Sequence, residues 1–292
     1  MASEISTVAV LGAGTMGRGI AHVSALAGYT TWLYDPFGEA LKKAESTIHR
    51  NLAKGVELGK VKAEDADRAR GGLHTAEDLA DAVREADLVI EAVPEDMALK
   101  VRTFQEVVRN CPEHALLASN TSALSITEMA AATGRPDRFA GMHFFNPVHV
   151  MKLIELVRGL ETSQETLDAM TRVGVRMGKE IVTVNESPGF VTSRINALIG
   201  NEAFRMLQEG VASAEDIDKA LKLGLNHPMG PFEMVDLVGL DVRLSILEFL
   251  QRTLGEAYRP NTLLIQHVKA GRLGRKVGRG VYNYNEQGER VR

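Results

Sequence analysis

Two histidines and a glutamate lie close together in residues 142–156, which read MHFFNPVHVMKLIEL. His143 precedes an Asn-Pro pair, and Glu155 follows in KLIELV, an apolar run that is typical of a strand. Histidine suits the removal of a hydroxyl proton near neutral pH, and a carboxylate on its second nitrogen fixes the tautomer and stabilises the imidazolium. His143 and Glu155 could therefore serve as a base and its partner in the oxidation of an alcohol.

Glu155 also has a purely structural interpretation. An ionised carboxyl inside a sheet is costly unless it is paired, so its place between Ile154 and Leu156 indicates either a solvated face or a dedicated partner. The residues alone leave both interpretations open. We expect the second histidine, His149, on the outer, solvent-facing side of the turn.

A glycine-rich segment forms the second candidate site. The motif GAGTMG follows the apolar run TVAVL and opens a helical pattern. In that context Gly12 makes a tight turn, Gly14 lets the backbone approach a pyrophosphate, and Gly17 lets the helix pack on the strand. The helix N-terminus, with Thr15 and Met16, then offers free N–H groups to phosphates. The motif predicts a dinucleotide site.

Asp35 strengthens this prediction. It ends the run TTWLYD, 21 residues after Gly14, where a carboxylate can hold the adenosine ribose hydroxyls. The competing interpretation is a glycine-rich turn with a surface aspartate. Because a carboxylate repels a 2′-phosphate, and Pro36 and Phe37 supply no arginine to bind one, we expect NAD as cofactor rather than NADP.

The elements that must position these residues alternate between strands and helices. Apolar runs predict strands at 7–12, 30–35, 86–93, 114–120, 138–145 and 152–157, and residues 39–85 show helical spacing that is longer than a crossover needs. The pattern indicates an α/β fold, an N-terminal Rossmann-type doubly wound sheet with a helical-pair insert. We place this NAD-binding domain at residues 1–184.

The remaining residues, 185–292, predict an all-α C-terminal domain for substrate binding and dimerisation. Helices are expected from the SPGF motif to about residue 209, after the capping box of Ser213 and Asp216, over 231–254 and over 261–270, followed by a loop-like tail.

Composition limits the possible partners. The 292 residues have a formal net charge of −4, which argues against a nucleic-acid partner, and no run approaches a transmembrane length. The single cysteine, Cys111, excludes an intrachain disulfide and a Cys-based zinc cluster, and no metal site is expected. Together with the lack of a secretion-type N-terminal segment, these features predict a cytoplasmic protein without a membrane partner.

Several motifs together resemble the short-chain L-3-hydroxyacyl-CoA dehydrogenases, including the 3-hydroxybutyryl-CoA dehydrogenases. They span nearly the whole chain: GAGTMG, ASNTSALSIT at 118–127, RFAGMHFFNPV at 138–148, MKLIELV, SPGF, and HPMGPFEMVDLVGLD at 227–241. The resemblance implies NAD-dependent, reversible oxidation of (S)-3-hydroxyacyl-CoA to 3-oxoacyl-CoA, on short chains such as 3-hydroxybutyryl-CoA, by a homodimer joined through the C-terminal domain.

The resemblance also implies roles for individual residues of the first domain. His143 matches the family's general base and Glu155 the acid that orients it. Ser122 matches a serine that contacts the substrate oxygen and the cofactor, and Asn146 an asparagine close to the nicotinamide.

Further matches concern the cofactor and coenzyme A. Glu95 and Lys100 match residues that line the cofactor, although alone they suggest a loop residue and a helix-surface lysine. Lys276 resembles a C-terminal lysine that reaches the cofactor region, with a solvated basic loop as the alternative. Lys54 of the helical insert is our choice for the coenzyme A nucleotide.

The chain departs from the family pattern at two positions. His149 replaces a proline, and Ser193 replaces an asparagine that helps complete the active site. Asn196, three residues after Ser193, could take over that role if the helix has already begun. Two other functions remain open: a dehydrogenase of free hydroxy acids on the same fold, and a non-catalytic NAD-binding protein.

Overall fold

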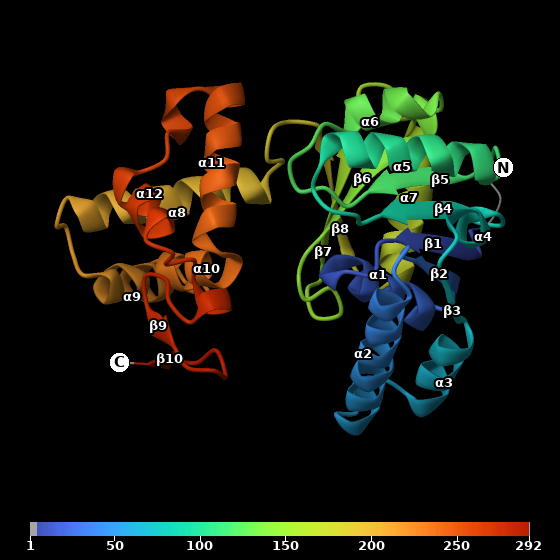
Figure 1. The fold of residues 1–292 in the computed structure, drawn as a ribbon, viewed down its shortest axis with the longest axis horizontal. Coiled ribbons are helices and arrows are strands. Elements are labelled where there is room, and N and C mark those ends of the chain that lie inside the picture. Colours follow the sequence, from blue (N-terminus) through green and yellow to red (C-terminus); the bar gives the residue numbers. More distant parts are fainter. Residues whose placement is uncertain (1–4, 292) are drawn as a thin grey trace. The chain divides into compact units, whose positions relative to one another are not determined.

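The strands within residues 7–185 form one eight-stranded sheet, in the order β3-β2-β1-β4-β5-β6-β7-β8 (Figure 1). The computed structural model describes residues 5–291. The strands are β1 Thr7–Leu11, β2 Thr30–Tyr34, β3 Leu73–Ala76, β4 Leu88–Glu91, β5 Leu116–Ser119, β6 Phe139–Phe144, β7 Leu153–Arg158 and β8 Glu180–Asn185. Neighbouring strands are parallel except for the antiparallel pair β6 and β7.

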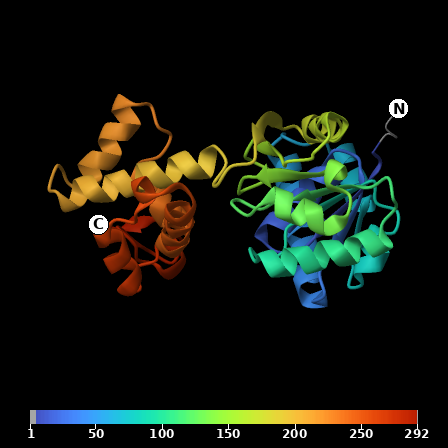
Figure 2. The same ribbon diagram turned by 90° about the horizontal axis from the view of Figure 1, so that it is seen from above.

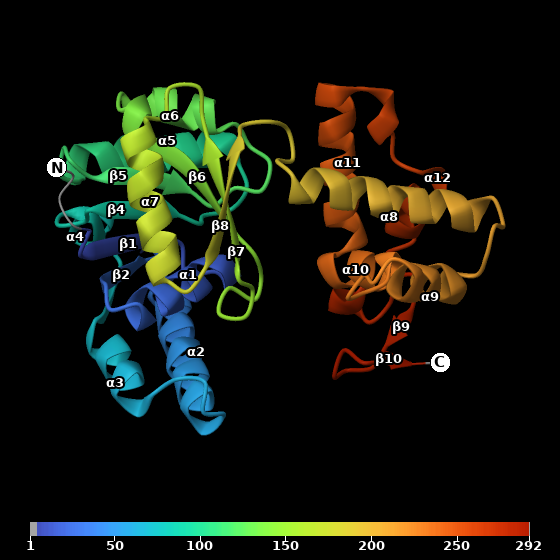
Figure 3. The ribbon, with the colours of Figure 1, turned by 180° about the vertical axis from the view of Figure 1, so that it is seen from behind.

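Helices cover both faces of this sheet, as the alternating sequence pattern predicts. Figure 1 shows α5 in front of the sheet, and Figure 3, from behind, shows α7 in front of it. The helices are α1 Thr15–Leu26, α2 Gly38–Glu57, α3 Ala63–Gly71, α4 Leu79–Val83, α5 Met97–Asn110, α6 Ile126–Thr133 and α7 Gln164–Arg176, with a 3-10 turn η1 at Pro136–Arg138. Central strands β1, β4 and β5 are buried along almost their whole length, which explains their continuous apolar sequences.

Two strands of the sheet are absent from the sequence prediction. β3 lies inside residues 39–85, which were expected to be helical, and β8 lies in a stretch with no assignment. Both strands are at the edges of the sheet. β3 is four residues long and β8 exposes most of its residues, so neither has the buried apolar run that marks a central strand.

The chain divides into two compact units, Met1–Ser187 and Pro188–Arg292. The second unit, coloured from yellow through orange to red in Figure 2, contains α8 Thr192–Gln208, α9 Ala214–Gly224, α10 Pro231–Val238, α11 Leu240–Leu254 and α12 Thr262–Lys269, with 3-10 turns η2 Glu256–Tyr258 and η3 Arg275–Val277. Its own apolar core includes Phe204 and Phe232, whose rings meet edge to face at 5.2 Å.

Two details of the second unit correct the sequence prediction. The helix expected over 231–254 is interrupted at Gly239, whose φ of +107° ends α10 and begins α11. The tail is not all loop, because β9 Asn283–Tyr284 pairs antiparallel with β10 Arg290–Val291. Hydroxyls of Tyr282 and Tyr284 donate to the buried carboxylates of Asp218 and Asp236 and hold this tail on the helices.

Candidate active site

The glycine-rich turn between β1 and α1 has room for a ligand at one glycine only. Gly12 has a φ of +99°, and a Cβ there would lie 2.8 Å from the Ala92 carbonyl oxygen. A Cβ on Gly17 would collide with the Gly12 carbonyl, whereas one on Gly14 would have no atom within 4 Å. Gly14 therefore faces open space at the start of α1, where the first N–H groups of the helix lack intrahelical acceptors. This geometry fits a dinucleotide pyrophosphate.

Asp35 is fixed beside that turn. One carboxylate oxygen accepts from the Ala13 N–H at 2.9 Å and the other from the Phe37 N–H at 3.1 Å. Each carboxylate oxygen can accept a further hydrogen bond, so the side chain can still hold ribose hydroxyls. The strand order reverses between β1 and β4, so the connections from these two strands lead to opposite sides and leave a crevice at their carboxyl ends. Open α/β sheets bind ligands in such a crevice, and this site lies there.

His143 and Glu155 meet across the antiparallel pair β6 and β7. They are direct cross-strand partners, and Nδ1 of His143 lies 2.8 Å from a carboxylate oxygen of Glu155. The side chains are buried, with His143 5% and Glu155 1% exposed. Glu155 thus has a dedicated partner, and the solvated-face interpretation is wrong. Since β6 runs parallel to β5, His143 lies at the same carboxyl edge of the sheet as the glycine turn.

The end of β4 carries a buried ion pair that the sequence did not indicate. Nζ of Lys100 lies 2.6 Å from a carboxylate oxygen of Glu91 and 3.2 Å from one of Glu95. Lys100 is only 1% exposed, so its interpretation as a helix-surface lysine is wrong. Burial raises the pKa of the Glu91 carboxyl, although Lys100 and the hydroxyl of Ser119 act in the opposite direction.

This ion pair organises the loop after β5. Glu95 also accepts hydrogen bonds from the hydroxyl of Thr121 at 2.5 Å and from the backbone N–H of Ser122 at 3.0 Å. Ser122 is half-buried at the carboxyl edge of the sheet. The side chain of Asn120 accepts from the Phe144 N–H at 2.9 Å, which ties β5 to the end of β6 next to His143.

The loop after β6 carries the remaining candidate of the first unit. Asn146 is exposed there, directly after Phe145, whose ring lies 4.5 Å from the imidazole of His143 between centroids. His149 is exposed, as expected, but its ring also stacks on the buried His22 of α1.

Two candidates lie in the second unit. Asn196 is half-buried on α8, in the second turn of a helix that has already begun at Thr192. Nζ of Lys276 lies 2.6 Å from both carboxylate oxygens of Asp241, so this lysine is held by an ion pair and is not a freely solvated loop cation.

The candidate coenzyme A residue, Lys54, lies on the outer side of α2. Leu41, Ala44, Ile48 and Leu52 form the buried side of this helix. At 100° per residue Lys43, Arg50 and Lys54 fall together on the opposite side, where they form a column of cations. Lys54 is exposed and donates to Glu57 at 3.1 Å. A phosphate could share or replace this weak surface ion pair.

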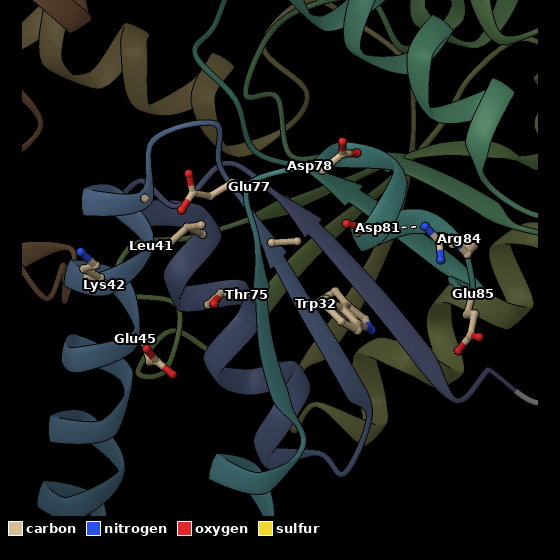
Figure 4. A pocket seen from close by; sticks show the side chains of 12 residues that line it. Trp32, Leu41, Lys42, Glu45, Thr75, Glu77, Asp78, Asp81, Arg84 and Glu85 are labelled. Atoms are coloured by element: carbon tan, nitrogen blue, oxygen red, sulfur yellow. Dashed lines mark hydrogen bonds and ion pairs between the residues drawn. The ribbon is translucent and has the colours of Figure 1, made fainter.

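A cavity of about 690 Å³ beside α2, β3 and α4 does not belong to this site (Figure 4). The lining includes two basic residues, Lys42 and Arg84. The acidic lining residues are more numerous: Glu45, Glu77, Asp78, Asp81 and Glu85. Such a lining repels phosphates, so we assign neither cofactor nor coenzyme A to it.

Fold and site together define a class of protein. A doubly wound sheet with a glycine turn and an acidic residue after β2 is typical of dinucleotide binding, and a buried His–Glu pair at the same sheet edge has the chemistry to accept a proton. This combination is that of a nicotinamide-dependent dehydrogenase of alcohols. The chain belongs to the 3-hydroxyacyl-CoA dehydrogenase family. The family's NAD-binding domain matches residues 7–187, and its C-terminal domain matches residues 189–284.

Individual relatives cover nearly the whole chain. A probable 3-hydroxybutyryl-CoA dehydrogenase of Bacillus subtilis is 47% identical over 97% of this chain and 99% of its own length. A 3-hydroxybutyryl-CoA dehydrogenase of Bradyrhizobium diazoefficiens is 45% identical over 97% of each chain. The crystal structure of (S)-3-hydroxybutyryl-CoA dehydrogenase PaaH1 from Ralstonia eutropha superposes with a TM-score of 0.93 at 43% identity, covering 97% of this chain and all of that one (100%).

The chain is therefore an NAD-binding oxidoreductase. Among residues 5–291, no helix is both long and apolar enough to cross a membrane.

Proposed function

We propose that this protein interconverts (S)-3-hydroxybutyryl-CoA and acetoacetyl-CoA, with NAD as hydride acceptor and His143 as the base. The observation that supports this most strongly is the buried His143–Glu155 pair at the cofactor edge of the sheet. The names of the relatives support a substrate with a short acyl chain, because these relatives, at 43–47% identity, are named 3-hydroxybutyryl-CoA dehydrogenases.

His143 handles the proton. Its Nδ1 is hydrogen-bonded to the Glu155 carboxylate, so Nε2 is the ring nitrogen that takes the proton of the substrate's 3-hydroxyl. The Glu155 carboxylate then stabilises the imidazolium that forms. NAD, when bound, accepts the hydride from the substrate carbon. In the reverse direction the imidazolium returns the proton to the oxygen of the 3-oxo group.

Ser122 and the two asparagines orient the reactants in this proposal. The hydroxyl of Ser122 hydrogen-bonds the substrate oxygen, while its backbone N–H is held by Glu95. Glu95 and the Lys100 that fixes it line the cofactor. Asn146 lies close to the nicotinamide, and Asn196 replaces the asparagine that the family has at position 193.

Charged residues bind the ends of the two large ligands. Asp35 holds the adenosine ribose, Lys54 with Lys43 and Arg50 contacts the coenzyme A phosphates, and Lys276 contributes to the cofactor region. Phosphates prefer such clustered cations, and the column on α2 supports this assignment.

The proposal extends to the whole protein. It is a cytoplasmic homodimer that associates through the second unit, and sedimentation at several concentrations would show a dimer. A single species with the mass of one chain would contradict this part of the proposal.

The direct experiment follows NADH absorbance with acetoacetyl-CoA and, in parallel, with free acetoacetate. The proposal expects turnover of the CoA thioester and at least a hundredfold lower kcat/KM for the free acid. Preference for the free acid would favour a hydroxy-acid dehydrogenase instead. Turnover of neither would favour a non-catalytic NAD-binding protein.

A further inference from the structure

The loop of residues 145–152 joins β6 to β7 and so connects His143 with Glu155. Its first residue, Phe145, packs its ring against the imidazole of His143, and Asn146 follows. The loop contains one tight turn, in which the N–H groups of Val150 and Met151 both donate to the Pro147 carbonyl at 2.9 Å. Any movement of this loop would reach the catalytic pair directly.

One side of the loop is seated on α1. Val148 is 2% exposed and lies over Gly19, where an added Cβ would come within 2.8 Å of the valine side chain. One turn further along the same helix, His22 stacks on His149 with ring centroids 5.5 Å apart and planes 5° from parallel. These contacts fit the loop to the helix that opens the cofactor site, but they are apolar or aromatic and include no hydrogen bond to the loop backbone.

The loop backbone is instead held by Lys179, which lies between α7 and β8. This lysine is 8% exposed, and its Nζ donates to the carbonyls of Val148 and Met151, the latter at 2.7 Å. Its neighbour Glu180 donates its backbone N–H to the Lys152 carbonyl at 2.7 Å. The ammonium therefore links the two arms of the turn to the sheet edge.

The contact between the Lys179 ammonium and the loop carbonyls can hold the loop in one position. Burying an ammonium costs free energy unless hydrogen bonds compensate for lost water, and burial lowers the pKa of Lys179. Two carbonyls of a single loop provide that compensation, so the lysine and the loop fix each other.

We propose that Lys179 is a positioning residue for the reaction. Its ammonium fixes the loop that holds Phe145 against His143 and carries Asn146, and so sets the imidazole for proton transfer. This inference rests on the proposed function of His143 and Glu155.

The test is a double-mutant cycle that combines Lys179→Met and Glu155→Gln in the full chain, assayed with NADH and acetoacetyl-CoA. Lys179→Met keeps the length of the side chain but removes its donors. We expect it to lower kcat at least tenfold while the Kd for NADH, from fluorescence titration, stays within twofold. In the Glu155→Gln background the same change should cost less than threefold, because residues that act as a unit are not additive.

Two further variants distinguish positioning from a general loss of structure. Lys179→Arg retains a charged donor and should recover at least a third of the wild-type kcat, and Lys219→Met, which removes an exposed lysine of α9, should match wild type. If Lys179→Met does not fold, Lys179→Gln, which keeps a shorter, uncharged donor group, replaces it in the cycle.

The outcomes distinguish the role of Lys179 from the proposed function of His143 and Glu155. Unchanged kcat in Lys179→Met, or equal losses in both backgrounds, would overturn the role of Lys179 while an active wild type and an impaired Glu155→Gln sustain the proposed function. An inactive wild type would overturn both.

Discussion

Asp35, Glu91 and Glu155 each use a carboxylate to fix a neighbouring group at the carboxyl edge of the sheet. Only Asp35 and Glu155 were candidates from the sequence. Glu91 sits in the apolar run ADLVIEAV, and a charged residue in such a run needs a partner, which is the same reasoning that made Glu155 informative. The partner, Lys100, lies in the following helix, and no local pattern indicates that the two meet.

At the residue scale, the charge of Asp35 should decide the choice of cofactor. Asp35→Ser keeps a small polar side chain but removes the charge that repels a 2′-phosphate and the strong acceptor for ribose hydroxyls. We expect kcat/KM for NADH to fall about tenfold, a loss of roughly 1.4 kcal/mol, while that for NADPH does not fall. A wild-type preference for NADPH, or an unchanged ratio in the variant, would refute this role.

His22 should make the stability of the first unit depend on pH. Burial, then His149, then Lys179 lower the pKa of His22 to about 4, below the value of 6.5 in the unfolded chain. The unfolded state therefore binds more protons between these values, so stability is lost as the pH falls through this window. For His22 the loss reaches about 2 kcal/mol at pH 5.

The measurement compares urea unfolding of wild type and His22→Phe at pH 7.5 and pH 5, followed by the fluorescence of Trp32, the single tryptophan of the chain. Phenylalanine keeps a ring for His149 to stack on but cannot take a proton. The variant should lose less stability on acidification than wild type. Equal losses in the two proteins would show that His22 does not titrate as described.

At the scale of elements, the central strands and the helices that cover them follow from sequence, because each buries a continuous apolar run or an apolar side. The edge strands β3 and β8 do not, since at least half of the residues of each are exposed and their pairing depends on a neighbour distant in the chain. The loop contact of Lys179 has no local signal either, because its acceptors are backbone carbonyls 28 and 31 residues away.

The column of cations on α2 yields a prediction for coenzyme A. Lys54→Ala should raise KM for acetoacetyl-CoA about three- to tenfold at low salt, with kcat and the Kd for NADH unchanged. The effect should shrink at high ionic strength, because exposed charges are screened. Arg109→Ala, an exposed cation on α5, is the matched control, and an equal effect of both variants would remove Lys54 from the site.

Helix α8 yields a further prediction, which concerns Asn196. Because α8 begins at Thr192, positions 193 and 196 lie one turn apart on the same side of the helix, so Asn196 can replace the asparagine that Ser193 lacks. Asn196→Ala should lower kcat about tenfold, or roughly 1.4 kcal/mol of transition-state stabilisation. Unchanged kinetics in a steady-state assay would remove Asn196 from the reaction.

At the scale of the whole molecule, each unit has its own core, and the first unit holds the glycine turn, Asp35 and the His143–Glu155 pair. The resemblance of its motifs to a family was sufficient to predict the fold class and the reaction, because those motifs are themselves the turns and strand ends of the site. It predicted that Glu155 orients His143, but not the contact of Lys100 with Glu91 or those of Lys179 with the loop carbonyls, which join residues from separate elements.

The central claim is that His143, held by Glu155, transfers the proton. The most direct test is kcat for acetoacetyl-CoA reduction by wild type and His143→Gln, with the Kd for NADH as a measure of an intact cofactor site. Glutamine fills similar space but cannot act as the base, so kcat should fall by about 10²–10⁴ with the Kd for NADH unchanged. A His143→Gln enzyme that keeps its kcat within threefold of wild type would contradict the account.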